Sequence, residues 1–332
     1  MIKTYNVKIP KNKFIASYKA LFVIGDVHGE YFLLEKLVRK INNIIFKLPR
    51  YVKKEVVFLG DYIDRGSNSK KTITFLINLQ KTLLRKKNVK TIFLCGNHDE
   101  FFYKLINAKN IIRIKDKELN LKQNPLQDLL YTSGKNIDVS GLKRWMEIGG
   151  GYSTIKDYCP QIKNEVEKIV YNYKNENDLK RLNFLMNIFQ NSIPKSHKIF
   201  FNKLINNLYY MIDDFLIIHA GIFPNKKLID QGIGKNAPKL NELNFLKLIM
   251  IRDEFLWAKK LNNCKHYIVH GHTPSERLRN NSIIPYTHNN FRLCLDTKVY
   301  AKNGSLTCFF KHNKKENFIS ISKKNLQTIR VF

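Results

Sequence analysis

Cysteine is scarce in this chain of 332 residues: there are five copies, and no two of them form a C-x-x-C pair. An odd number of cysteines argues against a disulfide framework, and the missing pairs argue against a structural zinc site built from thiolates. Free thiols persist in reducing compartments. We therefore expect the protein to be cytoplasmic.

Long hydrophobic runs are also missing. No stretch reaches about 18 uninterrupted apolar residues, so we expect no membrane-spanning helix. Residues 1–19 lack the apolar segment and the small-residue cleavage site of a secretory signal. The composition, 44% hydrophobic and 12% aromatic, is instead that of a folded chain. No linker or shift in composition divides it, so we expect a single domain over residues 1–332.

Acidic residues are few, 27 against 58 Lys and Arg, which gives a net charge of +31. Such a charge is compatible with nucleic-acid binding. However, 46 of the basic residues are Lys and 12 are Arg, whereas phosphate-reading surfaces favour the Arg fork. An excess of Lys, Asn and Ile also follows from A/T-rich codons. We interpret the charge as mostly compositional and keep nucleic-acid binding as the weaker alternative, although a positive field does attract anionic substrates such as phosphates.

The first third of the chain repeats one pattern: an apolar run ends in Gly, a polar turn follows, and a helical spacing comes next. The runs and turns cover residues 21–29, 56–66 and 91–100, and the helical spacings cover residues 31–46, 71–84 and 101–106. Short β-rich runs that alternate with helices indicate βαβ units, and runs that are apolar on both faces indicate a sheet covered on both sides. The pattern predicts an α/β fold.

The middle of the chain differs from this pattern. Residues 102–210 are rich in Lys and Asn and have helical patches at residues 182–189 and 199–210, so we expect a helical insertion within the domain. Strand-like runs return at residues 215–218, 267–269, 292–295, 306–310 and 318–321.

Side chains that can bind metals stand at the ends of five apolar runs, where open α/β sheets place their ligands. They are Asp26, His28, Asp61, Asp64, Asn97, His98, His219 and His272. Carboxylate, amide and imidazole groups together suit Mn, Fe, Zn or Mg. Two such ions about 3.5–4 Å apart form a clamp for phosphate esters, and Asp61 has the central position for a bridging ligand.

Five sequence blocks now allow a comparison with a known family. Residues 25–29 read G-D-V-H-G, residues 60–66 G-D-Y-I-D-R-G, residues 96–99 G-N-H-D, residues 219–221 H-A-G and residues 271–273 G-H-T. In kind and order they resemble the signature of the calcineurin-like metallophosphoesterases. The complete second block resembles the phosphoprotein phosphatase branch, bacterial type, which also includes diadenosine tetraphosphate hydrolases. The resemblance implies a central β-sandwich of mixed sheets flanked by helices.

The same resemblance implies roles for individual residues. Two divalent ions are expected, Mn before Fe or Zn, with a bridging hydroxide as nucleophile. The first ion would be bound by Asp26, His28 and Asp61, and the second by Asp61, Asn97, His219 and His272. His98 would be the general acid, oriented by Asp64, because a carboxylate keeps an imidazole protonated near neutral pH. Arg65 and Arg252, together with Asn97, would bind the substrate phosphate.

Three functions stay open at this point. The first is hydrolysis of phosphoserine or phosphothreonine in proteins, with a phosphoprotein or a phosphorylated small molecule as substrate. The second is cleavage of a dinucleoside polyphosphate, and the third is nucleic-acid binding with a degenerate metal site. The intact set of ligands argues against the third. Pro274 follows G-H-T where diesterases of the wider superfamily commonly carry the second His of G-H-x-H, and this favours monoesters.

Histidines outside these blocks receive a structural interpretation. We expect His270 to pack beside the site, and His197, His266, His288 and His312 to be solvated in polar loops. Residues 145–154, with Trp145, three glycines and Thr154, loosely resemble a block of the bacterial protein phosphatases.

Overall fold

The computed structural model describes residues 13–84, 88–113, 132–133, 135–238, 240, 242–262, 264–278, 283–288 and 291–323. The strands are β1 (Lys19–Ile24), β2 (Lys53–Phe58), β3 (Val89–Phe93), β4 (Asn110–Ile112), β5 (Thr132–Ser133), β6 (Asn136–Asp138), β7 (Tyr209–Ile212), β8 (Phe215–Ile218), β9 (Tyr267–His270), β10 (Tyr286–His288), β11 (Arg292–Cys294), β12 (Ser305–His312) and β13 (Lys315–Ser322). The α-helices are α1 (Tyr31–Lys47), α2 (Ser69–Leu84), α3 (Asn97–Asn107), α4 (Val139–Glu147), α5 (Gly151–Tyr158), α6 (Lys163–Asn172), α7 (Glu176–Ser192), α8 (Lys195–Leu204), α9 (Glu242–Met250) and α10 (Asp253–Leu256). Short 3₁₀ helices are η2 (Pro160–Ile162), η3 (Ile229–Gln231) and η4 (Ser275–Arg277).

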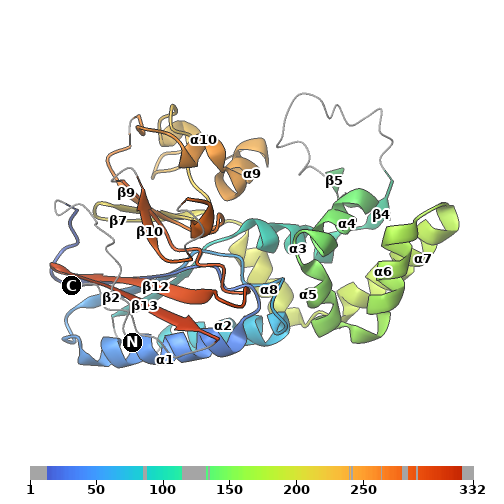
Figure 1. The fold of residues 1–332 in the computed structure, drawn as a ribbon, viewed down its shortest axis with the longest axis horizontal. Helices are drawn as coiled ribbons and strands as arrows, with labels where there is room; N and C mark the ends of the chain where they lie inside the picture. The colour runs from blue at the N-terminus through green and yellow to red at the C-terminus, as the bar shows by residue number, and fades with distance from the viewer. Residues whose placement is uncertain are drawn as a thin grey trace.

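Two mixed sheets form the centre of the molecule (Figure 1). The first has the order β13-β12-β1-β2-β3, and the second has the order β10-β11-β9-β8-β7. In the first sheet β1 pairs in parallel with β2 and antiparallel with β12. In the second sheet β9 pairs in parallel with both β8 and β11. The predicted α/β fold with mixed sheets flanked by helices is therefore confirmed.

The alternation of side chains along β1 explains why the two sheets pack together. Leu21 and Val23 lie in one apolar cluster with residues of the second sheet, among them Phe215 and Val269. Phe22, between them in sequence, points to the other face and lies in the cluster that includes the apolar side of α1. Because neighbouring residues of a strand face opposite sides, the apolar run from Ala20 to Ile24 is buried on both faces.

The segment predicted as a helical insertion does contain α4 to α8. α6 and α7 extend to one side of the sandwich, whereas α8 lies beside α2 and α3 (Figure 1). It also contains the small sheet β4-β6-β5. Residues 114–131 and 134 of this segment lie outside the described residues. The helical prediction for residues 199–210 was wrong at its end, because α8 stops at Leu204 and Tyr209 begins β7. Aromatic residues in succession favour a strand, and β7 pairs with β8.

α9 and α10 lie above the second sheet (Figure 1), and α9 also contacts α3. Within the described residues, no helix has both the length and the apolar character required to cross a membrane.

Candidate active site

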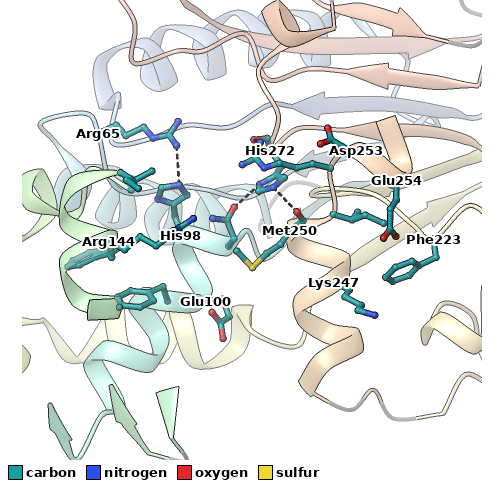
Figure 2. A pocket seen from close by; sticks show the side chains of 18 residues that line it. Arg65, His98, Glu100, Arg144, Phe223, Lys247, Met250, Asp253, Glu254 and His272 are labelled. Atoms are coloured by element: carbon teal, nitrogen blue, oxygen red, sulfur yellow. Dashed lines mark hydrogen bonds between the residues drawn. The ribbon is translucent and has the colours of Figure 1, made fainter. Parts of the chain in front are cut away.

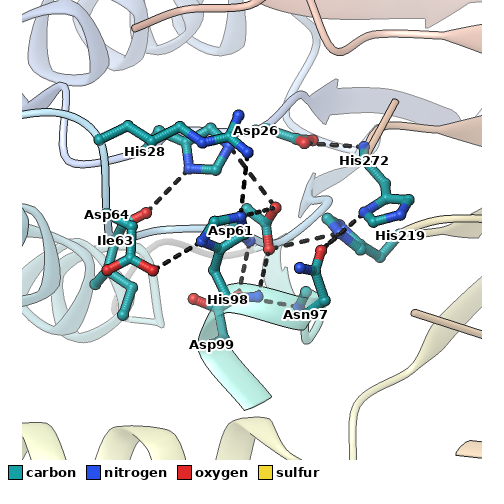
Figure 3. Close-up of polar contacts among 12 residues, drawn as sticks. Asp26, His28, Asp61, Ile63, Asp64, Asn97, His98, Asp99, His219 and His272 are labelled. Atoms are coloured by element: carbon teal, nitrogen blue, oxygen red, sulfur yellow. Dashed lines mark hydrogen bonds and ion pairs between the residues drawn. The ribbon is translucent and has the colours of Figure 1, made fainter. Parts of the chain in front are cut away.

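The loops that follow five strands meet at one place (Figure 3). Three loops leave the first sheet after β1, β2 and β3, and two leave the second sheet after β8 and β9. They bring together the residues that the sequence analysis singled out: Asp26, His28, Asp61, Asp64, Arg65, Asn97, His98, His219 and His272. The site therefore depends on the packing of the two sheets against each other.

Asp61 lies at the centre of this cluster. Its carboxylate belongs to two groups of buried side chains whose ligand atoms lie within 4.8 Å of one another: Asp61 with His28 and His98, and Asp61 with His219 and His272. Asp61 Oδ2 is 3.7 Å from His28 Nε2, and Asp61 Oδ1 is 3.5 Å from His219 Nε2. These separations exceed a hydrogen bond and are close to the distance between two ligands of one ion.

Backbone carbonyls fix the orientation of three of these imidazoles. His28 and His219 each place Nδ1 3.0 Å from a carbonyl oxygen, of Ile63 and Leu59 respectively. His272 instead places Nε2 3.2 Å from the carbonyl of Met250. A ring nitrogen that donates to a carbonyl leaves the other nitrogen as a lone-pair donor, which is the state that binds a metal. Burial lowers the pKa of all three histidines, which also favours the neutral ring.

Asp26 brings a second carboxylate to the cluster, and one of its oxygens is left over. Asp26 Oδ1 is buried without a hydrogen-bond partner among the described residues, although Oδ2 accepts from the backbone N–H of His272 at 2.9 Å. Burial, followed by the carboxylates of Asp296 and Asp61, raises the pKa of Asp26. A Cβ at Gly271 would lie 2.0 Å from Asp26 Oδ1, so only glycine leaves room for this oxygen. These observations fit a site for divalent cations.

The backbone of the site is strained. His28, Asp61, Asp64, Arg65 and His272 all have a positive φ, between 44° and 71°. This left-handed region is uncommon for side chains other than Asn, Asp or Gly, and it is maintained only where the surrounding structure requires it.

Asp99 helps to hold these loops in their strained conformation, although the sequence analysis did not assign it to the site. Its buried carboxylate accepts hydrogen bonds from the backbone N–H groups of Asp61 (2.7 Å), Tyr62 (3.0 Å) and Gly96 (3.0 Å). Asp99 thus fixes the loops after β2 and β3 relative to each other. Asp99 is the last residue of the G-N-H-D block, and this position in the sequence could have indicated its role.

His98 and Asp64 form a buried pair beside Asp61. His98 Nδ1 is 2.7 Å from Asp64 Oδ2, and Trp145 Nε1 donates to the same oxygen at 2.6 Å. Thr154 Oγ1 donates to Asp64 Oδ1 at 2.5 Å. With both oxygens of Asp64 occupied, the rotation of this carboxylate is fixed, and so is the direction of the His98 ring. Trp145 and Thr154 belong to the block that the sequence analysis treated as a loose match.

The two predicted phosphate-binding arginines line a common cavity of about 570 Å³ (Figure 2). Arg65 packs over the ring of Tyr300 at 4.3 Å, and its Nη2 is 3.4 Å from His98 Nε2. Arg252 Nη1 donates to Thr273 Oγ1 at 3.0 Å. Asn97 also lines this cavity, with Oδ1 2.8 Å from His272 Nδ1. The structure thus brings every predicted site residue to one location, and their individual roles stay predictions.

Two histidines outside the site are buried, where the sequence analysis expected them to be exposed to solvent. His197 and His288 were expected in solvent, but their exposed fractions are 2% and 7%. His197 lies between Tyr158 OH (2.7 Å) and Thr74 Oγ1 (3.0 Å). His288 Nε2 is 3.0 Å from His270 Nε2, and His270 packs beside the site as expected.

Comparison with known proteins identifies the class. The profile of the calcineurin-like phosphoesterase family matches residues 20–301. The chain therefore belongs to this family of metallophosphoesterases, which are hydrolases, and the predicted family resemblance is confirmed.

Individual relatives are more distant. The chain is 28% identical over 144 residues to the bis(5'-nucleosyl)-tetraphosphatase PrpE of Oceanobacillus iheyensis, a match that covers 35% of this chain and 52% of that protein. It thus spans about half the length of this curated relative. Similar solved structures include a proposed diadenosine tetraphosphatase (13% identity, 93% of this chain and 96% of the other, TM-score 0.47). They also include a protein serine/threonine phosphatase from Saccharomyces cerevisiae (15% identity, 95% and 83% coverage, TM-score 0.47).

Proposed function

We propose that this chain is a phosphomonoesterase that removes phosphate from phosphoserine and phosphothreonine in proteins. The observation that supports it best is the cavity in which Arg65 and Arg252 lie beside the His98–Asp64 pair and the Asp61 cluster. A dianionic monoester offers three terminal oxygens to such a set of cations, whereas a diester offers two and carries less charge. The electrostatic complement therefore favours the monoester.

Two divalent ions, Mn in this proposal, complete the site. Asp26, His28 and Asp61 would hold one ion, and Asp61, Asn97, His219 and His272 would hold the other. When bound, the ions supply Lewis acidity to the phosphoryl oxygens and lower the pKa of water. A cytoplasmic location, expected from the cysteine spacing, stays part of the proposal.

The protein's own side chains have three tasks in this reaction. Arg65 and Arg252 orient the phosphate oxygens through charge-assisted hydrogen bonds. His98 Nε2 faces the cavity and delivers a proton to the oxygen of the departing serine or threonine. Asp64, fixed by Trp145 and Thr154, lies 2.7 Å from Nδ1 of His98 and holds the ring in its reactive direction.

A substrate panel tests the proposal. Purified protein with added Mn should hydrolyse a phosphoserine or phosphothreonine peptide with a kcat/KM well above that for diadenosine tetraphosphate and for a bis-aryl phosphodiester. Comparable or reversed values for the diester would contradict the monoesterase assignment. Protein treated with a chelator is the control for contaminating activity.

A second candidate is hydrolysis of a dinucleoside polyphosphate. It is favoured by the partial similarity to PrpE, whose name states this activity. The same panel separates the two candidates, because each predicts a different best substrate.

A further inference from the structure

The cavity continues beyond the two phosphate-binding arginines. Its outer walls include Arg144 of α4 on one side and Lys247 of α9 on the other. Figure 2 shows these two residues on opposite sides of His98, each farther out than the catalytic groups. Neither residue belongs to the sequence blocks that identify the family.

The charges on these walls are unequally neutralised. Two of the lining acids already have cationic partners: Glu100 pairs with Lys104, and Asp253 pairs with Arg277, both at 2.7 Å. Among the described residues Arg144 and Lys247 have no ion pair, and Lys247 lies over the ring of Phe223 at 4.9 Å. Glu254 is exposed and is the third acid of the lining. The outer cavity therefore presents two cations without acidic partners.

Apolar surface lies between these charges. Ile148 is 66% exposed, and the half-buried Phe101 stacks on Trp145 with ring centroids 5.5 Å apart. Both line the cavity together with Phe223. Such a surface suits the backbone and side chains of a polypeptide that crosses the cavity, with charged contacts at its two ends.

We propose that Arg144 and Lys247 bind acidic side chains on the two sides of the phosphorylated residue, so that the preferred substrate is an acidic phosphoprotein segment. This inference rests on the proposed protein phosphatase function. An extended chain advances about 3.3 Å per residue, so residues two or three positions away lie roughly 7–10 Å from the phosphorylated residue on either side. A ligand that extends in one direction only would reach one of the two cations.

The test uses phosphopeptides that differ only in their flanks. Four peptides have neutral flanks, acidic residues before the phosphoserine, acidic residues after it, or lysines on both sides. Each acidic flank should raise kcat/KM about two- to fivefold over the neutral peptide, the range of a solvent-accessible ion pair. Arg144→Met should abolish the advantage of one acidic flank, and Lys247→Met that of the other.

Matched controls lie next to both residues. Lys143 is on the same helix as Arg144 but pairs with Glu147 and does not line the cavity. Lys226 contacts the ring of Phe223, as Lys247 does, but lies outside the cavity. Lys143→Met and Lys226→Met should leave all four kcat/KM values unchanged. Arg144→Glu should instead favour lysine over the acidic flank on its side, which a loss of folding would not produce.

The outcomes are distinguishable. If phosphopeptides are hydrolysed but the ratio of acidic to neutral kcat/KM is one, or if it falls equally in the control variants, the inference is wrong and the proposed function stands. If diadenosine tetraphosphate is hydrolysed and no phosphopeptide is, the proposed function itself fails. In that case an effect of Arg144→Met on the tetraphosphate would assign these cations to polyphosphate binding and overturn the peptide inference.

Discussion

The buried histidines of this protein fall into two groups, those around Asp61 and those elsewhere, and the groups differ in how their ring nitrogens are used. Around Asp61, His28 and His219 each hold one nitrogen against a backbone carbonyl and direct the other toward the carboxylate. In the helical segment, His197 has a hydroxyl neighbour at each nitrogen. His270 and His288 contact each other.

Burial alone does not separate these two groups of histidines. Burial lowers the pKa of His28 and His219 and likewise that of His197, to about 4. The difference is the second nitrogen: a histidine with a remaining lone pair directed at carboxylates can bind a metal, whereas one enclosed by hydroxyl groups serves the packing. Four substitutions test how the residues of these two groups act.

The largest effect is expected for Asp61→Asn. Because Asp61 belongs to both groups of ligand atoms, its loss should abolish turnover and reduce the metal content per chain. Steady-state kinetics and metal analysis measure both quantities. Asp157→Asn, which alters a carboxylate beside α2 in the helical segment, is the matched control and should keep activity. Two bound ions and a near-normal rate in Asp61→Asn would refute the central role of this residue.

His98→Asn should slow the reaction by about 10²- to 10⁴-fold with alkyl phosphates and should keep the metals. An aryl phosphate needs less protonation of its leaving oxygen, so its rate should fall less. The slope of log kcat against leaving-group pKa measures this difference. Equal losses across the series would show that His98 is not the acid.

Trp145→Phe removes the Nε1–H group that donates to Asp64 and keeps an aromatic ring in its place. A hydrogen bond to a charged group suggests a loss of roughly ten- to a hundredfold in kcat. The loss should be greatest with poor leaving groups, because Trp145 acts through His98. Trp257→Phe changes the other tryptophan, which is exposed and bonds Asp253, and should have no effect. A change in KM alone would indicate a role in binding instead.

The smallest effect concerns His197 and the pH dependence of stability. Burial, followed by the charge of Lys70, lowers the pKa of His197 to about 4, whereas an unfolded chain binds this proton near pH 6.5. Between these values the unfolded state binds more protons, so stability falls as the pH falls. His197→Gln should reduce this loss, measured as a shift of about 2 °C in the change of Tm between pH 7 and pH 5. Identical pH profiles would mean that His197 titrates normally in the folded protein.

The sequence predicted which side chains come together around Asp61, because each of these candidate ligands lies shortly after an apolar strand. The predicted strand at residues 215–218 coincides with β8, and His219 comes next. Glycines mark the same positions: a Cβ at Gly96 would lie 2.1 Å from Asp61 Oδ1. The order of residues along the chain was therefore sufficient to identify the candidate ligands.

The residues that hold Asp64 in place could not be predicted from local sequence patterns in the same way. Trp145 and Thr154 reach Asp64 from 81 and 90 residues away, a proximity that no local pattern encodes. His197 has polar neighbours in sequence, but α8 turns it to the face that also buries Phe200 and Phe201. Its environment follows from tertiary packing, which a sequence pattern does not contain.

The order of strands in the first sheet has a consequence for protein synthesis. β1 leads directly to Asp26 and His28, yet one of its two edges is covered by β12, so that Phe22 pairs with Phe310. β12 and β13 are the last strands in the described part of the chain. Synthesis must therefore proceed past β12, far along the chain from β1, before the strand that leads to Asp26 and His28 has both of its partners.

An incomplete chain that ends before Ser305 would expose the edge of an apolar strand. Such edges readily pair with other chains and promote aggregation. Premature termination should therefore yield insoluble fragments, and partially active phosphoesterases should not accumulate. The pairing of β12 with β1 thus links the closure of the first sheet to the strand that leads to Asp26 and His28.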